Sequence, residues 1–230
     1  MYDIRISRYT GYVDTDWLMV PVTVVGVGAI GRQVALQCGA MGFQTIQLVD
    51  HDIVEAVNMG TQGYRPDQID IHKVDATAQD ILRIFPECTV VTHDKKFDTE
   101  VATDVRGVVF VCVDSMTARR EIAEWIVSRR QRYPILIDGR MRRTTIRIAS
   151  CDQDSFQAYL GNLYTDAEAL NERCTAQTTI FMASVAAGLM INRFIEHKKE
   201  YAQGYLDQLF DPGACMMDMA KVQQLDKASV

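Results

Sequence analysis

Residues 20–31 read VPVTVVGVGAIG and contain the pattern that decides the fold. The run from Val20 to Val27 is rich in β-branched residues, which predicts a strand buried on both faces. Glycines then stand at Gly26, Gly28 and Gly31, in the spacing G-x-G-x-x-G. A strand that leads through this spacing into a helix is typical of a nucleotide-binding turn.

Strands and helices alternate from this turn onward. We expect a helix over Ile30–Met41 that ends at Gly42, followed by a strand over Thr45–Val49. The next expected elements are, in order, a helix, two strands, a helix and a strand: His72–Phe85, Thr89–Thr92, Gly107–Val113, Met116–Arg130 and Ile135–Asp138. This order predicts an α/β fold with a doubly wound, Rossmann-like, mostly parallel sheet.

The second half of the chain is less regular. Thr144–Ala149 alternates between polar and apolar residues, so we expect an antiparallel extension of the sheet there. Residues 151–177 are expected to form a crossover-type loop with a short strand near Phe156–Leu160, and a long helix follows over Thr178–Lys198. We predict one domain of 230 residues. Its ends are an N-terminal arm over residues 1–19 and an unplaced C-terminal tail over residues 211–230.

Composition argues against several functional classes. The net charge of −6 is unlike that of a nucleic-acid-binding protein. The six cysteines form no C-x-x-C pair, so we predict neither a disulfide framework nor a structural zinc site. We find no secretory signal and no apolar run long enough to span a bilayer, so we expect a cytoplasmic protein. The cluster of Arg140, Arg142 and Arg143 is either a solvated hairpin turn or a binding site for phosphate or an acidic partner.

Asp50 supports the prediction of a bound nucleotide. It ends the second expected strand, 19 residues after Gly31, where an acid would accept a hydrogen bond from a ribose hydroxyl. The helix that starts after Gly28 would offer free N–H groups to a phosphate. These residues do not say which nucleotide binds.

Further polar residues favour ATP chemistry. When a carboxylate attacks the α-phosphorus of ATP and pyrophosphate leaves, negative charge builds up, so a cation and a carboxylate-bound Mg²⁺ are needed. Lys73 and Asp114 offer these groups, each next to the carboxyl end of a strand or at the start of a helix.

The order of these motifs resembles the ThiF/MoeB/HesA family, which includes the adenylation domains of ubiquitin-activating enzymes. The matching features are G-x-G-x-x-G, then D-x-D-x-V-x-x-x-N at residues 50–58, then Lys73 and Asp114, and the resemblance covers about residues 20–195. It implies an adenylyltransferase that uses ATP and Mg²⁺ to activate the C-terminal glycine carboxylate of a ubiquitin-like or sulfur-carrier protein. The implied partners are a small β-grasp protein ending in Gly-Gly and a second copy of the chain.

The resemblance also implies roles for single residues. Asp50 would hold the ribose, Asp52 and Asn58 would organise the phosphate side, Lys73 would stabilise the transition state, and Asp114 would bind Mg²⁺. The implied nucleotide-binding set is Gly26, Gly28, Ala29, Ile30, Gly31, Asp50, Asp52, Asn58, Gln62, Lys73 and Asp114. Structural interpretations stay open for four of these residues: turn caps for Asp52 and Asn58, a solvated helix residue for Lys73, and a helix N-cap for Asp114.

The chain departs from the family pattern at Thr61, where relatives usually have an arginine. Arg65 is one candidate substitute. Arg5 or Arg8 is another, because relatives often supply an arginine from the N-terminal segment, in some of them across a dimer interface.

Cys174 follows Arg173 and precedes the long helix, at a place where family members often have a cysteine. A neighbouring arginine and a helix N-terminus favour the thiolate, so Cys174 is a candidate for a thioester or persulfide bond with the carrier. An incidental loop cysteine is the alternative.

Three other functions remain open. One is an ATP-dependent dehydratase or small-molecule adenylating enzyme on the same fold. Another is an NAD-dependent oxidoreductase, which would use the glycines and Asp50 but leave Lys73 and Asp114 unexplained. The third is a non-catalytic binding subunit, which Thr61 favours.

Overall fold

The computed structural model describes residues 6–9, 11–98, 105, 107–128, 135–142, 145–152, 155–163, 179–202 and 215–218. Its centre is a seven-stranded sheet with the order β3-β2-β1-β4-β5-β6-β7. The strands are β1 (Val22–Val25), β2 (Thr45–Val49), β3 (Thr89–His93), β4 (Val108–Val111), β5 (Leu136–Arg142), β6 (Thr145–Cys151) and β7 (Cys215–Asp218). β1 to β5 pair in parallel, and β6 and β7 add antiparallel pairs. The doubly wound α/β sheet with an antiparallel extension is therefore confirmed.

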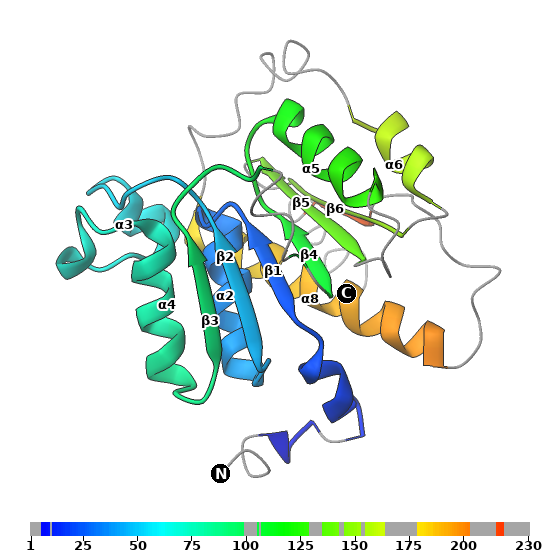
Figure 1. Ribbon diagram of the computed structural model, residues 1–230, viewed down its shortest axis with the longest axis horizontal. Coiled ribbons are helices and arrows are strands. Elements are labelled where there is room, and N and C mark those ends of the chain that lie inside the picture. The colour runs from blue at the N-terminus through cyan, green and yellow to red at the C-terminus, as the bar shows by residue number, and fades with distance from the viewer. Residues whose placement is uncertain are drawn as a thin grey trace, which may run out of the picture.

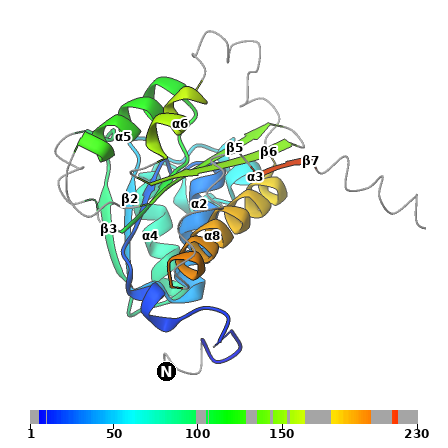
Figure 2. The ribbon, with the colours of Figure 1, turned by 90° about the vertical axis from the view of Figure 1, so that its right-hand side faces the viewer.

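Helices cover both faces of this sheet (Figures 1 and 2). On one face lie α2 (Ala29–Met41), α4 (Lys73–Ile84) and α8 (Ile180–Ala202), and on the other lie α5 (Met116–Ser128) and α6 (Phe156–Gly161). Successive strand residues point to opposite faces, so Val24 belongs to the first core cluster and Val25 to the second. Three short helices complete the described elements: η1 (Thr15–Met19), α3 (Asn58–Gln62) and η2 (Pro66–Gln68).

Most expected elements of the first half are confirmed within one or two residues. The strand expected near Phe156–Leu160 is wrong, because α6 occupies that stretch. Phe156 and Tyr159 are both buried in the second core cluster, and their three-residue spacing brings them to one helical face. The tail, which the pattern did not place, contributes β7 beside β6.

The order of the strands determines where a ligand can bind. β1 lies between β2 and β4, and the chain builds the sheet outward from β1 in both directions. This is the topological switch point at which open α/β sheets bind ligands, outside the carboxyl ends of their strands. Among the described residues, no helix combines the length and the apolar character needed to cross a membrane.

Candidate functional site

The glycine turn begins where β1 ends. Gly26 has φ +87°, and a Cβ there would lie 2.8 Å from the carbonyl carbon and oxygen of Cys112. A Cβ on Gly31 would lie 1.8 Å from the carbonyl oxygen of Gly26. A Cβ on Gly28 would meet no atom within 4 Å. Gly26 and Gly31 therefore let the backbone segments pack, whereas the space above Gly28, before the first turn of α2, is open to a phosphate.

The two kinds of glycine should respond differently to alanine. Gly31→Ala should lower the free energy of unfolding by about 1–3 kcal/mol, because the methyl group overlaps the backbone. Gly28→Ala should leave the unfolding midpoint near that of the wild type and weaken ATP binding about tenfold or more, since the methyl group occupies the phosphate space. Chemical denaturation and calorimetric titration with Mg²⁺ and ATP measure the two effects. Equal losses of stability in both variants would contradict this assignment.

Asp50 connects the glycine turn to the segment after β2. Its Oδ2 accepts a hydrogen bond from the Val27 N–H at 2.6 Å, and its Oδ1 accepts one from the Asp52 N–H at 2.9 Å. The carboxylate therefore holds two loops together. Each oxygen keeps a further lone pair, which leaves capacity for a ribose hydroxyl.

Lys73 and Asp52 form an ion pair near the carboxyl end of β2. The Lys73 Nζ lies 2.7 Å from the Asp52 Oδ2, and the Lys73 side chain is only 8% exposed. Burial alone would raise the pKa of Asp52, but the hydrogen bond and charge of Lys73 hold that pKa below its ordinary value. Asp52 therefore stays ionised near neutral pH and orients the ammonium group. This arrangement does not fit a solvated helix lysine.

Asn58 has a structural role in the loop between β2 and α4. Its Oδ1 accepts a hydrogen bond from the Glu55 N–H at 2.9 Å, which caps the turn before α3. In α3, the main-chain carbonyl oxygen of Gln62 accepts a hydrogen bond from Gln33 Nε2 at 3.3 Å. Thr61 of this helix donates at 3.4 Å to the carbonyl of Val57, the residue before α3. These contacts support the turn-cap interpretation of Asn58 and leave a nucleotide contact by Gln62 as a prediction.

Arg65 lies in a network of charged residues next to this loop. Its Nε lies 2.9 Å from Asp67 Oδ1, and its Nη1 pairs with Asp80. Asp80 also accepts from Arg32 at 2.7 Å and from Gln68 at 3.0 Å. Burial would raise the pKa of Asp80, but these donors hold it below its usual range. Arg65 would have to leave two ion pairs to reach a phosphate.

Asp114 lies beyond the carboxyl end of β4 and is exposed. The neighbouring Ser115 caps α5, because its Oγ accepts from the Ala118 N–H at 3.2 Å. Within the described part of the chain, no hydrogen bond or ion pair involves the Asp114 carboxylate. The N-cap interpretation is therefore wrong. Asp114 offers an uncommitted carboxylate one residue after Val113, whose backbone lies against Gly26.

A second possible metal-ligand group is less suitable. Ligand atoms of Asp50, His51 and Asp52 lie within 4.8 Å of one another. Asp50 already accepts two backbone N–H groups, and Asp52 is bound by Lys73. Asp114 differs from both, because none of the described residues forms a hydrogen bond or ion pair with its carboxylate.

The structure describes the side chain of one arginine of the sequence cluster, Arg140. Arg140 belongs to β5, and its Nε lies 2.7 Å from the fully buried Asp138. Arg119 of α5 also pairs with Asp138 and donates to the Val113 carbonyl, and the Tyr159 hydroxyl donates to Asp138 at 3.1 Å. Arg140 is therefore part of a buried network beneath the loop after β4, not of a solvated turn. Arg143 lies outside the described residues.

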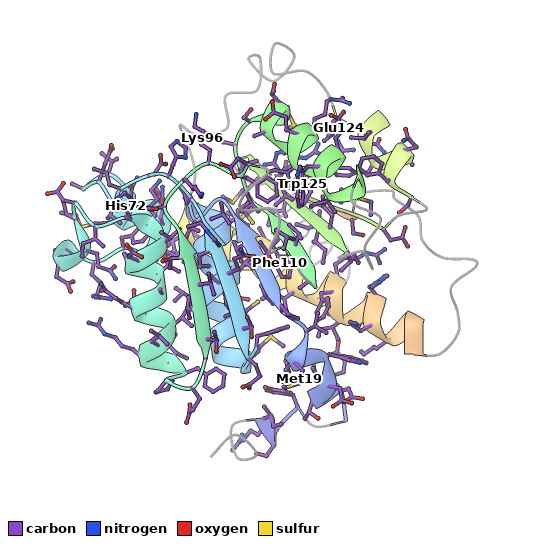
Figure 3. The ribbon with its side chains drawn as sticks, in the orientation of Figure 1. Met19, His72, Lys96, Phe110, Glu124 and Trp125 are labelled. Carbon is purple, nitrogen blue, oxygen red and sulfur yellow. The ribbon has the colours of Figure 1, made fainter. Side chains whose placement is uncertain are left out.

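The structure adds three residues that the sequence patterns did not single out for a role. Lys96 follows the end of β3, and its charge helps to lower the pKa of Asp52, after burial and the stronger effect of Lys73. Figure 3 shows Lys96 and His72 toward the carboxyl ends of the central strands. Met19, which precedes β1, lies toward their amino ends. Tyr64 contacts the Val27 carbonyl of the glycine turn, and Arg32 packs against the Tyr64 ring. Only the position of Lys96 after a strand could have been noticed in the sequence.

Arg8, a further candidate, is not brought to this site. Arg8 is exposed, and its neighbour Tyr9 donates to the Met41 carbonyl at the far end of α2 from the glycine turn. A helix of 13 residues is about 20 Å long, so Arg8 is remote from the glycine turn of its own chain. Cys174 and Arg5 lie outside the described residues.

Sequence comparison relates this chain to a known protein family. The model of the ThiF family matches residues 12–225. Ubiquitin-like modifier-activating enzyme 5 of Caenorhabditis elegans is 31% identical over 115 residues, which are 44% of this chain and 27% of that protein. The protein of the same name from Oryza sativa subsp. japonica is 32% identical over 114 residues, 43% of this chain and 27% of that protein. The match thus spans just over a quarter of the length of these curated relatives.

Solved structures share the fold. The E. coli tRNA N6-threonylcarbamoyladenosine dehydratase TcdA superposes with a TM-score of 0.65 at 18% identity, covering 87% of this chain and 96% of that one. E. coli MccB, solved with ATP, superposes with a TM-score of 0.64 at 18% identity, covering 84% of this chain and 64% of that one.

Proposed function

This chain belongs to the ThiF family, and we propose that it uses ATP to adenylate the C-terminal glycine carboxylate of a small ubiquitin-like or sulfur-carrier protein. The observation that supports the proposal is that three features follow β1, β2 and β4, the strands that adjoin at the switch point of the sheet. These are the open space above Gly28, the oriented ammonium group of Lys73 and the uncommitted carboxylate of Asp114. An oxidoreductase would need only the first.

Each group has a task in carboxylate activation. The turn at Gly28 and the start of α2 would bind the phosphates through backbone N–H groups. Lys73, oriented by Asp52, would stabilise the negative charge that develops as pyrophosphate leaves. Asp114 would hold Mg²⁺, which supplies further positive charge to the phosphates when it is bound.

ATP–pyrophosphate exchange tests the proposal. A β-grasp protein that ends in Gly-Gly should stimulate exchange, and the same protein without its last glycine should not, because the reacting carboxylate is displaced. Exchange that appears only with an unrelated carboxylic acid would point to a small-molecule adenylating enzyme. Binding of a nicotinamide dinucleotide without any binding of ATP would sink the proposal.

A non-catalytic binding subunit is the second candidate function. Thr61 stands where relatives usually have an arginine, and its hydroxyl donates to the Val57 carbonyl. Arg65, the nearest substitute in sequence, is bound by Asp67 and Asp80. We further propose a homodimer in which Arg5 or Arg8 of one copy supplies the missing cation to the other. A protein that binds the carrier but shows no exchange under any condition would favour the non-catalytic function.

Cys174 is proposed to accept the acyl group from the adenylate. Its thiolate would form a C–S bond to the acyl carbon while AMP leaves. Burial raises the pKa of all four cysteine thiols whose side chains the structure describes, Cys38, Cys88, Cys112 and Cys151, which disfavours them as nucleophiles.

Cys174→Ala should therefore leave ATP–pyrophosphate exchange within about twofold of the wild type and remove a thiol-sensitive adduct with the carrier, because adenylation precedes acyl transfer. Non-reducing electrophoresis detects the adduct. Cys151→Ala is the matched control and should retain it, since burial raises the pKa of the Cys151 thiol to about 12. Loss of exchange in Cys174→Ala would show that this role is wrong.

A further inference from the structure

The middle residue of the glycine turn is held on two sides by side chains. The Val27 N–H donates to Asp50, as described above, and the Val27 carbonyl oxygen lies 2.7 Å from the hydroxyl of Tyr64. Tyr64 is 4% exposed and stands just after α3, 37 residues from Val27 along the chain. Both hydrogen bonds act on the backbone between Gly26 and Gly28, where the phosphate space opens.

The same hydroxyl also contacts the start of α4. It lies 3.4 Å from the carbonyl oxygen of Lys73 and 3.3 Å from the hydroxyl of Thr77. Thr77 Oγ1 accepts from Arg32 Nη1 at 3.0 Å, so its own hydrogen is available for Tyr64. Tyr64 can then use its hydrogen for the nearest acceptor, the Val27 carbonyl. Burial raises the pKa of Tyr64, so the hydroxyl keeps that hydrogen at neutral pH.

The ring of Tyr64 is held independently of its hydroxyl. The Arg32 guanidinium lies 4.0 Å from the ring centroid, and Arg32 is itself 2% exposed. Arg32 also donates to the Gly63 carbonyl at 3.1 Å and to Asp80 at 2.7 Å. Removal of the hydroxyl alone should therefore leave the ring in place.

We propose that the Tyr64 hydroxyl is a positioning group of the nucleotide site, which holds the turn at Val27 and Gly28 in register with the start of α4, where Lys73 lies. Tyr64 does not touch the nucleotide in this role and acts through the backbone of the turn. The inference rests on the proposed function, because it needs ATP as the ligand of the turn.

Tyr64→Phe tests this role. The dissociation constant of ATP is measured by calorimetric titration of ATP into the full chain in the presence of Mg²⁺. It should rise roughly three- to tenfold, as expected for one lost hydrogen bond in a preformed site. Amide hydrogen exchange over residues 26–31 should also accelerate in the absence of nucleotide, because the turn has lost one of its two side-chain contacts.

Tyr9→Phe is the matched control. It also removes a tyrosine hydroxyl that donates to a backbone carbonyl, that of Met41, but at the opposite end of α2. We expect it to change the unfolding midpoint by a similar amount and to leave ATP affinity and the exchange of residues 26–31 unchanged. An equal loss of ATP affinity in both variants would mean that the effect is one of general stability, and would overturn the proposal.

The titration separates this inference from the function on which it rests. Wild-type protein that binds no ATP would refute the proposed function and the role of Tyr64 together. Wild-type protein that binds ATP, with Tyr64→Phe within about twofold of it, would refute only the role of Tyr64, since one lost hydrogen bond should exceed that margin.

Discussion

Lys73→Ala should reduce ATP–pyrophosphate exchange by about a hundred- to a thousandfold, the range found when one preorganised charge-stabilising group is removed from an active site. The Lys73 ammonium is held by Asp52 at 2.7 Å before any nucleotide binds, so it needs little reorganisation when negative charge develops. The fall should appear mainly in kcat, because the charge it stabilises is greatest in the transition state. Initial exchange rates over a range of ATP concentrations separate kcat from KM.

The fold should survive this substitution. Asp52 is half exposed, so the loss of its ion pair should cost less than about 1 kcal/mol of stability. Lys199→Ala is the matched control, because Lys199 also pairs with an acid, Glu196 at 3.3 Å, but lies near the end of α8. Exchange by Lys73→Ala within threefold of that control would exclude Lys73 from the chemistry.

Asp114→Asn should reduce exchange by a similar factor of about a hundred or more, because it removes the carboxylate charge expected to hold Mg²⁺. Asparagine is nearly the same size and retains hydrogen-bonding capacity, so a loss of activity would report the charge and not the shape. High Mg²⁺ should restore part of the rate if the defect is weakened metal binding. The measurement is exchange rate against Mg²⁺ concentration, with unfolding midpoints recorded for both proteins.

Ser115→Ala provides the contrast for Asp114. Ser115 caps α5 through its hydroxyl, so this variant should lose about 1 kcal/mol of stability and keep its dependence on Mg²⁺. Asp114→Asn should show the opposite pattern. A stable Asp114→Asn protein with wild-type exchange and wild-type Mg²⁺ dependence would leave Mg²⁺ binding by Asp114 without support.

Much of the candidate site could be predicted because its parts are local. The β-branched run before Gly26 predicts β1, the glycine spacing predicts the turn, and helical periodicity predicts α2. Ligands bind outside the carboxyl ends of such parallel strands, so the positions of Asp50 after β2 and of the glycines after β1 indicate one site, and Asp50 does bond the glycine turn.

The roles of individual polar groups depended on contacts between distant segments. Asp114 and Ser115 are adjacent in sequence, and only the structure shows which of them caps α5. The sequence left Arg140 in either a solvated turn or a binding site for phosphate or an acidic partner, yet it is buried against Asp138. The α6 segment, expected as a strand, is a helix; its few apolar residues fit either periodicity until the core-facing side is known.

The sequence by itself determined the α/β class, the order of the central elements and the location of the nucleotide turn, because periodicity and turn chemistry act over neighbouring residues. Only the tertiary structure decided that Asp52 orients Lys73, that Asp114 remains uncommitted and that Tyr64 reaches Val27 across 37 residues. Hydrogen bonds and burial of this kind depend on which segments the sheet brings side by side, and no local pattern contains that information.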